Sequence, residues 1–237
     1  MPNRYFQFNR FIIWHDKCAM KVGTDGVLLG AWANVDKVQD ALDVGTGTGL
    51  IAIMLAQRSR AKIDAVEIDE SACRQAGENI SACPWHQRIN LVYSPFQEYA
   101  ARCNKVYDLI VSNPPYFRNQ FRPSEKSRAV ARHDDSLSLK DLVFFAGQIL
   151  KPDGIISVVL PAESMDTYRE YLLQNHLYIT RILYVMPLPG MPVKRILVEA
   201  GREKKTIEEN HIAIESGRRH HYTQQYIDLT SAFYLAF

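Results

Sequence analysis

The sequence predicts an α/β fold built on one mostly parallel sheet that is covered by helices on both faces. From residue 38 onward, short apolar segments alternate with longer segments of helical periodicity. Parallel strands need crossover connections of this kind, and the crossovers place helices on the faces of the sheet. The chain has 237 residues, 47% of them hydrophobic, which suits one large α/β domain and is too short for two.

The predicted elements follow in regular order. Strands are expected at 38–44, 61–68, 88–93, 105–112, 155–160, 178–187 and 194–201. Helices are expected at 50–58, 71–83, 138–154 and 165–175, the third of them beginning at serines and ending at Pro152 and Gly154. The segment PLPGMPV joins the last two strands and is too short for a crossover helix, so the final strand is expected to run antiparallel.

The N-terminal 36 residues have a different character. They contain the aromatic-rich segment YFQFNRFIIWH, followed by a short helix expected at 24–32. We therefore expect residues 1–36 to form a cap on a main domain of residues 37–237.

Composition and charge exclude several classes of protein. The net charge is only +2, so any nucleic-acid contact has to come from local basic patches. No apolar run approaches the length of a membrane span, and the N-terminus lacks the features of a signal peptide. The four cysteines show no C-x-x-C pairing and no histidines at metal-ligand spacing. These features predict a cytoplasmic protein with reduced thiols, no membrane contact and no metal.

A glycine-rich loop, DVGTGTGL at residues 43–50, lies between the first strand and the first long helix. Gly45, Gly47 and Gly49 let the chain turn tightly and approach a ligand. The spacing departs from the G-x-G-x-x-G dinucleotide fingerprint, and the loop has no lysine for a phosphate. Asp43 disfavours a pyrophosphate and favours a cofactor with a cationic, zwitterionic end. The alternative is a purely structural turn.

Glu67 closes the second strand about 20 residues beyond the loop, where an acid can accept hydrogen bonds from both ribose hydroxyls of a nucleoside cofactor. The pattern D-x-G-x-G-x-G with a strand-end acid resembles the S-adenosylmethionine site of class I methyltransferases. That resemblance implies a Rossmann-like sheet that binds S-adenosylmethionine at the carboxyl ends of its strands.

The segment VSNPPY ends the strand at 105–112 and raises two interpretations. Pro114 and Pro115 have a fixed φ and no N–H, so they can simply terminate a strand. The tetrapeptide also resembles the catalytic motif of methyltransferases that act on adenine N6 and related planar nitrogens. The Asn113 side chain and the Pro114 carbonyl could accept both N–H bonds of an exocyclic amine, while Tyr116 could stack on the base.

Longer segments resemble one bacterial family that converts the adenosine at position 37 of a valine tRNA to N6-methyladenosine. They are HDKCAMKVGTDGVLLGAWA, DVGTGTGL, DAVEID, SNPPY and YIDLTSAFYLAF, which together span nearly the whole chain. The resemblance implies that the N-terminal cap contributes to the cofactor pocket of a methyltransferase domain. The cofactor-binding residues that it implies are Lys21, Val22, Thr24, Asp25, Asp43, Gly45, Thr46, Gly47, Gly49, Glu67, Ile68, Phe96 and Asn113.

One position departs from the class I pattern. These enzymes commonly place an aspartate after the third strand to hold the adenine amino group of the cofactor, and this chain has Ser94 and Pro95 there. Phe96 can still pack on the adenine face, and its backbone N–H can still reach a ring nitrogen. We therefore expect the protein to distinguish the adenine amino group of the cofactor from other substituents less strictly.

Basic and aromatic residues follow the NPPY motif and suit an RNA strand whose bases stack while arginines contact phosphates. A solvated surface loop is the alternative interpretation. The predicted RNA-binding residues are Arg118, Arg122, Lys126, Arg128, Arg132, Lys194 and Arg195.

Three functions stay open on the sequence. The first is methylation of adenine N6 in tRNA. The second is methylation of guanine N2 or of a protein glutamine, because N-P-P-[YF] also serves those nitrogens. The third is a non-catalytic RNA-binding protein that kept the shape of the pocket. The sequence carries no signal for the oligomeric state.

Overall fold

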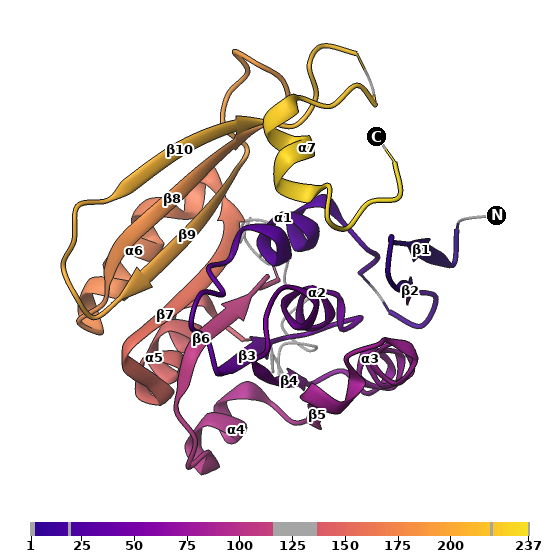
Figure 1. The fold of residues 1–237 in the computed structure, drawn as a ribbon. Coiled ribbons are helices and arrows are strands. Elements are labelled where there is room, and N and C mark those ends of the chain that lie inside the picture. The colour runs from indigo at the N-terminus through magenta and orange to yellow at the C-terminus, as the bar shows by residue number, and fades with distance from the viewer. Residues whose placement is uncertain (1–2, 19, 116–136, 219, 237) are drawn as a thin grey trace, which may run out of the picture.

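The computed structural model describes residues 3–18, 20–115, 137–218 and 220–236. A sheet of eight strands runs through the molecule, with the α/β architecture that the sequence predicts (Figure 1). In sheet order the strands are β10 (Glu208–Ala213), β8 (Tyr178–Met186), β9 (Arg195–Gly201), β7 (Leu150–Pro161), β6 (Tyr107–Ser112), β3 (Asp40–Val44), β4 (Lys62–Glu67) and β5 (Ile89–Tyr93).

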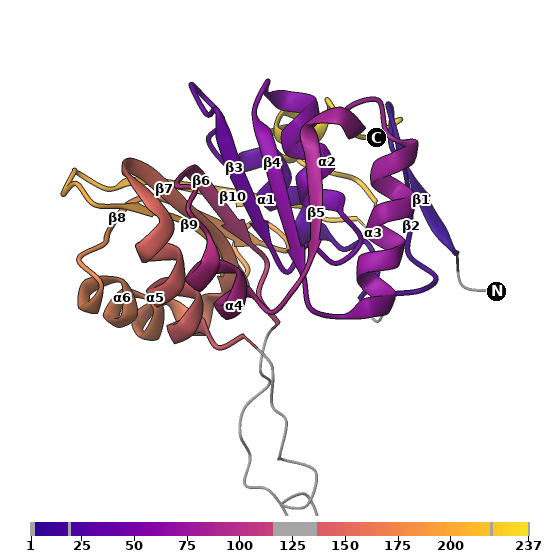
Figure 2. The ribbon, with the colours of Figure 1, turned by 90° about the horizontal axis from the view of Figure 1, so that it is seen from below.

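Two layers of helices cover the faces of the sheet. One hydrophobic core joins α1 (Thr24–Trp32), α2 (Leu50–Arg58), α3 (Glu70–Ala82) and α7 (Gln224–Thr230) to one face. A second core joins α4 (Phe96–Arg102), α5 (Leu139–Ile149) and α6 (Met165–Gln174) to the other face. Burial of the sheet on both faces explains why its central strands are almost continuously apolar. Figure 2 shows the two layers from below.

β9 is antiparallel to both of its neighbours, β7 and β8, which confirms the direction expected for the segment at 194–201. It is not the last strand, however. β10 follows it and pairs in parallel with β8 at the edge of the sheet. The charged sequence EENHIA gave no strand signal, because an edge strand with a solvated face does not need an apolar pattern.

β3 lies at the point where the strand order reverses. It pairs in parallel with β4 on one side and with β6 on the other. Ligands of open α/β sheets bind in the crevice outside the carboxyl ends of such strands. The glycine loop follows β3 and the NPPY motif follows β6, so the fold brings both motifs to this crevice.

The N-terminal segment forms a hairpin of β1 (Tyr5–Gln7) and β2 (Ile12–Trp14) that lies apart from the main sheet (Figure 1). Its inner side chains join the same hydrophobic core as α1, which begins and ends where the sequence predicts. The C-terminal tail returns to the hairpin, where Asn9 N donates to Phe233 O at 2.7 Å. Because hairpin, α1 and main domain share one core, the boundary at residue 36 stays a prediction.

The helix expected at 138–154 is wrong at its C-terminal end. Helix α5 ends at Ile149, and β7 begins at Leu150, so Pro152 and Gly154 lie in a strand. Leu150 pairs with Tyr107 and Ile155 with Leu109, which leaves four residues of β7 in an irregular bulge. Strand pairing with β6 therefore overrides the helix-ending signal of proline and glycine.

Within the described residues no helix is long and apolar enough to cross a membrane. The same part of the chain has no group of three or more histidine, cysteine, aspartate or glutamate side chains that could hold a metal ion.

Gly154 lies in β7 at a position with no room for a side chain. A Cβ atom there would lie 2.7 Å from the Tyr107 carbonyl oxygen and 2.9 Å from Leu150 Cδ1. We expect Gly154→Ala to lower the free energy of unfolding by about 1–3 kcal/mol, because a backbone atom cannot yield easily. Urea unfolding measures this. Gly147→Ala in helix α5 is the matched control: its nearest neighbour is 3.8 Å away, and it should raise stability by about 0.5–1 kcal/mol. Equal effects of the two substitutions would contradict the account.

Candidate active site

The glycine loop turns sharply at the carboxyl end of β3. Gly45, Gly47 and Gly49 have φ values of +69°, +57° and +82°, a region that side chains disfavour. The N–H groups of Gly45 and Thr46 both donate to Val66 O, at 2.9 and 3.0 Å, which fastens the loop to β4. A Cβ atom at Gly45 or Gly47 would meet no atom within 4 Å, so both glycines face open space. The loop is therefore shaped for close approach of a ligand.

Glu67 closes β4 and holds the loop. The residue is 7% exposed, and its Oε2 accepts from Gly47 N at 2.7 Å. Oε1 accepts from Ile68 N and Asp69 N at 3.0 and 2.9 Å. A carboxylate has further lone pairs, so this acid can still accept from a ligand hydroxyl.

Asp43 lies beneath the loop, fully buried. Oδ2 accepts from Thr46 Oγ1 at 2.5 Å and from Ala52 N, in helix α2, at 3.1 Å. Burial raises the pKa of Asp43 to about 7; the two hydrogen bonds oppose this rise and the charge of Glu67 adds to it. Oδ1 has no hydrogen-bond partner in the described part of the chain.

Asn113 follows β6 and reaches the same crevice. Val44 and Ser112 are paired neighbours of β3 and β6, and Ser112 Oγ donates to Val44 O at 2.9 Å. This pairing fixes the residue after each strand relative to the other. Pro114 is buried and Pro115 is exposed.

A cavity of about 310 Å³ connects these motifs. It lies between the glycine loop, Asn113 and the segment that precedes helix α1. Its lining includes eight of the predicted cofactor residues: Lys21, Val22, Thr24, Asp25, Gly45, Thr46, Gly47 and Asn113.

A second hollow of about 40 Å³ adjoins the first at Gly45. Ile68, Ser94 and Phe96 contribute to its wall. Phe96 is 4% exposed and stands at the start of helix α4. The predicted residues Asp43, Gly49 and Glu67 line neither hollow and instead support the loop.

Asp25 and Arg195 form an ion pair that the sequence did not suggest. Arg195 Nε donates to Asp25 Oδ2 at 2.9 Å, so a predicted RNA-binding residue contacts a predicted cofactor residue. Lys194 is exposed beside this pair. Tyr116, Arg118, Arg122, Lys126, Arg128 and Arg132 lie outside the described residues.

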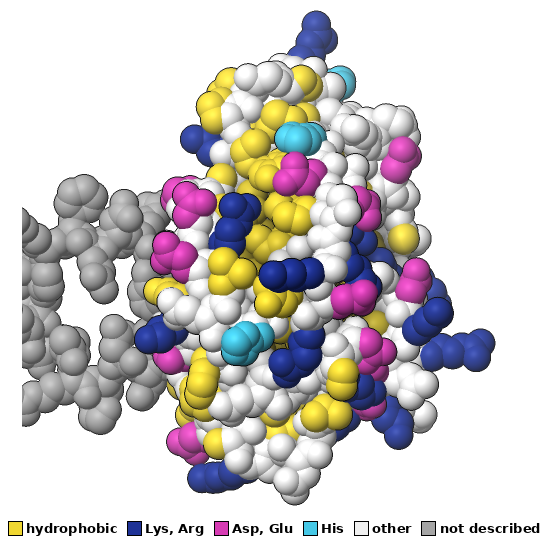
Figure 3. Space-filling view, turned by 90° about the vertical axis from the view of Figure 1, so that its left-hand side faces the viewer, with side chains coloured by type: hydrophobic (Ala, Val, Ile, Leu, Met, Phe, Trp, Pro, Cys, Tyr) yellow, Lys and Arg dark blue, Asp and Glu magenta, His cyan; other side chains and the backbone are white. Residues whose placement is uncertain are grey.

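A larger cavity lies elsewhere, at the amino ends of β7, β8 and β10. It measures about 520 Å³ and contains the ion pair of Arg181 with buried Glu199. It contains none of the motif residues. Figure 3 shows the nearby face over β8, β10 and α6, where basic and acidic side chains both border an apolar strip. We therefore place the candidate site at the smaller cavity, where the motifs meet.

Comparison with known proteins gives the family. Residues 22–180 match the methyltransferase small domain family. The chain is 47% identical over 236 residues to a tRNA1(Val) (adenine(37)-N6)-methyltransferase of Parabacteroides distasonis, with 99% of each chain covered. It is 45% identical to the protein of that name from Trichodesmium erythraeum, with 100% of each chain covered.

The chain belongs to the tRNA1(Val) (adenine(37)-N6)-methyltransferase family. This confirms the resemblance expected from its motifs.

Solved structures agree on the fold of this methyltransferase family. A predicted O-methyltransferase from Agrobacterium tumefaciens superposes with a TM-score of 0.68 at 16% identity, covering 90% of this chain and 98% of that one. A glycopeptide N-methyltransferase complexed with S-adenosylmethionine superposes with a TM-score of 0.54 at 14% identity, covering 78% and 90%. At these identities the likeness concerns the class I fold.

Sequence reasoning missed two polar residues behind the cavity, His15 and Asn79, which are 6% and 1% exposed. Asn79 had a usable signal. It occupies the apolar stripe of an amphipathic helix between Ala76 and Ile80, and a polar residue there is buried and has to find partners.

Asp43→Asn should change how stability depends on pH. The folded-state pKa of about 7 lies above the ordinary value of 3.8, so the stability that depends on this carboxyl is fully present below pH 3.8 and is lost as pH rises from 3.8 through 7. Relative to Asp43→Asn, the wild type should lose about 2–3 kcal/mol of unfolding free energy between pH 5 and pH 8. Urea unfolding of both proteins at the two pH values measures the difference. Parallel stability curves would contradict burial of an ionisable Asp43.

Proposed function

We propose that this protein transfers a methyl group from S-adenosylmethionine to N6 of the adenosine at position 37 of a valine tRNA. The observation that carries the proposal is that Asn113 and the glycine loop line one cavity. Membership of a family whose curated relatives carry that activity in their names supports the choice of substrate.

The hollows beside the glycine loop fit S-adenosylmethionine. They share Gly45 as a lining residue and have volumes of about 310 and 40 Å³. The larger hollow has polar and charged walls, which suit the amino-acid end of the cofactor. The smaller one has the apolar walls of Val66 and Phe96, which suit contact with a face of its adenine. When bound, S-adenosylmethionine supplies an activated methyl group on a sulfonium.

The residues of the chain then have separate roles. Gly45, Thr46 and Gly47 would form the surface under the cofactor while Gly49 shapes the turn, and Glu67 would accept from the ribose hydroxyls. Lys21, Val22, Thr24 and Asp25 close the amino-acid end, while Ile68 and Phe96 enclose the adenine. Asp43 supports the loop from below through Thr46 and Ala52.

Asn113 and Pro114 act on the substrate. The lone pair of an adenine amine is delocalised into the ring, so the amine is a poor nucleophile. Acceptance of its two N–H bonds by the Asn113 side chain and the Pro114 carbonyl would favour a pyramidal nitrogen and stabilise the positive charge that develops there. Pro115 keeps the backbone rigid and Tyr116 stacks on the base. After transfer, the nitrogen loses one proton to solvent.

The tRNA substrate presents an anticodon loop whose bases are already unpaired, so extrusion of the target costs little. Lys194 and the basic residues at 118, 122, 126, 128 and 132 would contact its phosphates, in the cytoplasm where tRNA is modified. Arg195 contributes through Asp25, its ion-pair partner at the cavity wall.

The proposal is tested by incubating the protein with S-adenosylmethionine labelled in its methyl group and with total tRNA, then digesting the RNA to nucleosides. We expect the label in N6-methyladenosine, derived from valine tRNA. Label in guanosine or only in added protein would identify one of the alternative methyltransferases. No transfer to any substrate, with normal tRNA binding, would favour the non-catalytic protein.

Asn113→Ala should separate cofactor binding from methyl transfer. Loss of one acceptor at the reacting nitrogen is expected to lower kcat by about 10²–10³-fold, while the Kd for S-adenosylmethionine changes little. Single-turnover kinetics and calorimetry measure the two quantities. Asn210→Ala is the control, because Asn210 is exposed on β10 at the far edge of the sheet. Normal turnover by Asn113→Ala would show that Asn113 has a different role.

A further inference from the structure

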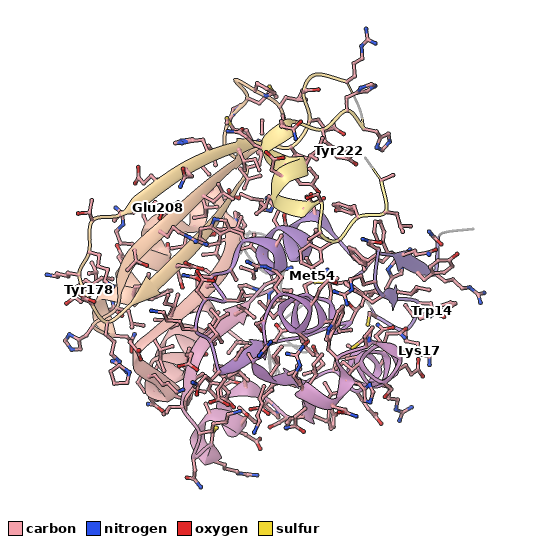
Figure 4. All side chains as sticks on the ribbon, in the orientation of Figure 1. Trp14, Lys17, Met54, Tyr178, Glu208 and Tyr222 are labelled. Atoms are coloured by element: carbon pink, nitrogen blue, oxygen red, sulfur yellow. The ribbon has the colours of Figure 1, made fainter. Side chains whose placement is uncertain are left out.

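Three polar side chains on one face of helix α3 hold the N-terminal segment against the glycine loop. Gln75, Glu78 and Asn79 are three and four residues apart, so they lie on one side of the helix. Gln75 and Asn79 are 0% and 1% exposed. Figure 4 shows Trp14 and Lys17, two of the residues that they contact, beside this helix.

Asn79 makes three hydrogen bonds to backbone groups from two distant parts of the chain. Oδ1 accepts from Trp14 N at 2.9 Å. Nδ2 donates to Trp14 O and to Thr48 O, each at 2.8 Å. One amide nitrogen thus joins the end of strand β2 to the glycine loop. Thr48 lines the larger cavity, so the junction lies directly behind its wall.

The segment after Trp14 is fastened in two further ways. Lys17 N donates to Gln75 Oε1 at 3.2 Å, and the Lys17 ammonium forms an ion pair with Glu78. Gln75 Nε2 donates to Glu78 at 3.1 Å, which orients that carboxylate. The chain then continues directly into the cavity-lining segment at 20–26.

His15 joins the end of strand β2 to the cavity-lining segment at 20–26. Its Nδ1 accepts from Val22 N at 3.4 Å, and its Nε2 lies 2.9 Å from Asn3 O. Both contacts are satisfied together only by the neutral tautomer with hydrogen on Nε2. Val22 lines the cavity, so α3 is connected to the cavity wall through the Asn79–Trp14 hydrogen bonds, the covalent link from Trp14 to His15, and the His15–Val22 hydrogen bond.

We propose that Asn79 is a positioning residue that fixes the N-terminal wall of the cofactor pocket relative to the glycine loop. It lines neither hollow. Asparagine suits this task because one side chain supplies an acceptor and two donors at once. Alanine removes all three bonds, and the near-isosteric aspartate places a carboxylate against two carbonyl oxygens. This proposal rests on the proposed function in one respect only, that S-adenosylmethionine is the ligand of the pocket.

Loss of the three Asn79 hydrogen bonds should lower the fraction of molecules in which residues 20–26 and the glycine loop are held together as walls of one pocket. If that fraction falls to about one tenth, the apparent Kd for S-adenosylmethionine rises about tenfold, while kcat at saturating cofactor changes by less than about twofold. We expect this KM-against-kcat split for both Asn79→Ala and Asn79→Asp. Since each bound molecule has an intact Asn113, the chemical step itself is preserved.

Amide hydrogen exchange of the protein without cofactor provides a test that needs no activity. In Asn79→Ala, exchange should accelerate at residues 20–26 and 45–49, the two walls that Asn79 joins, and stay unchanged in β7 and β9. Two controls separate positioning from stability. Asn175→Ala removes an amide that donates to Tyr171 O at the C-terminal end of helix α6, and Leu172→Ala truncates a buried side chain of the second core.

The outcomes are distinct. Faster exchange at both walls together with weaker cofactor binding, absent from the two controls, supports the positioning role. A loss of stability equal to that of Leu172→Ala, with cofactor Kd and wall exchange unchanged, would overturn it. If the wild type fails to bind S-adenosylmethionine, the proposed function is wrong, while the exchange result still decides the role of Asn79.

Discussion

The parallel pairing of β3 with β6 is the constraint on which the site depends. Its register sets Val44 opposite Ser112, and the Ser112 hydroxyl adds a bond to the Val44 carbonyl at the last paired position. The next residues along each strand are the glycine loop and Asn113. A slip of one residue would turn every side chain of β6 to the other face of the sheet. The buried strands on both sides, β4 and β7, prevent such a slip because each carries its own apolar pattern.

The crevice at the switch point supplies only one side of the pocket. The opposite wall comes from residues 20–26, an N-terminal segment that the fold has to hold against the carboxyl ends of the strands. This wall is held by polar contacts to α3 and by the ion pair of Asp25 with Arg195 of β9. Polar contacts of this kind specify geometry, because a buried amide is satisfied in one arrangement only. The hairpin and α1 add the apolar burial that stabilises the wall.

The sequence predicted the parts of the fold that periodicity and motif spacing control. The strands that flank the glycine loop, helix α1 and the antiparallel β9 are of this kind. It did not predict β10, whose polar edge-strand sequence resembles a loop, or the end of α5, where pairing of Leu150 with Tyr107 overrides Pro152 and Gly154. In the site, motif residues such as Gly45 and Asn113 could be found by local pattern. The helical pattern marks Asn79 as a buried polar residue, but not its partners. The contacts of Asn79, His15 and Arg195 could not be found, because they span 31 to 170 residues or depend on backbone groups.

The central claim is that Asn113 and Pro114 accept the amino group of an adenosine at the mouth of the pocket that holds the methyl donor. A crystal structure of the protein with S-adenosylhomocysteine and an anticodon-arm RNA of valine tRNA tests this most directly. The account predicts the adenine of position 37 turned out of the loop, with N6 within hydrogen-bond distance of Asn113 Oδ1 and Pro114 O. Cofactor bound away from the glycine loop, or an adenine whose N6 faces other groups, would contradict it.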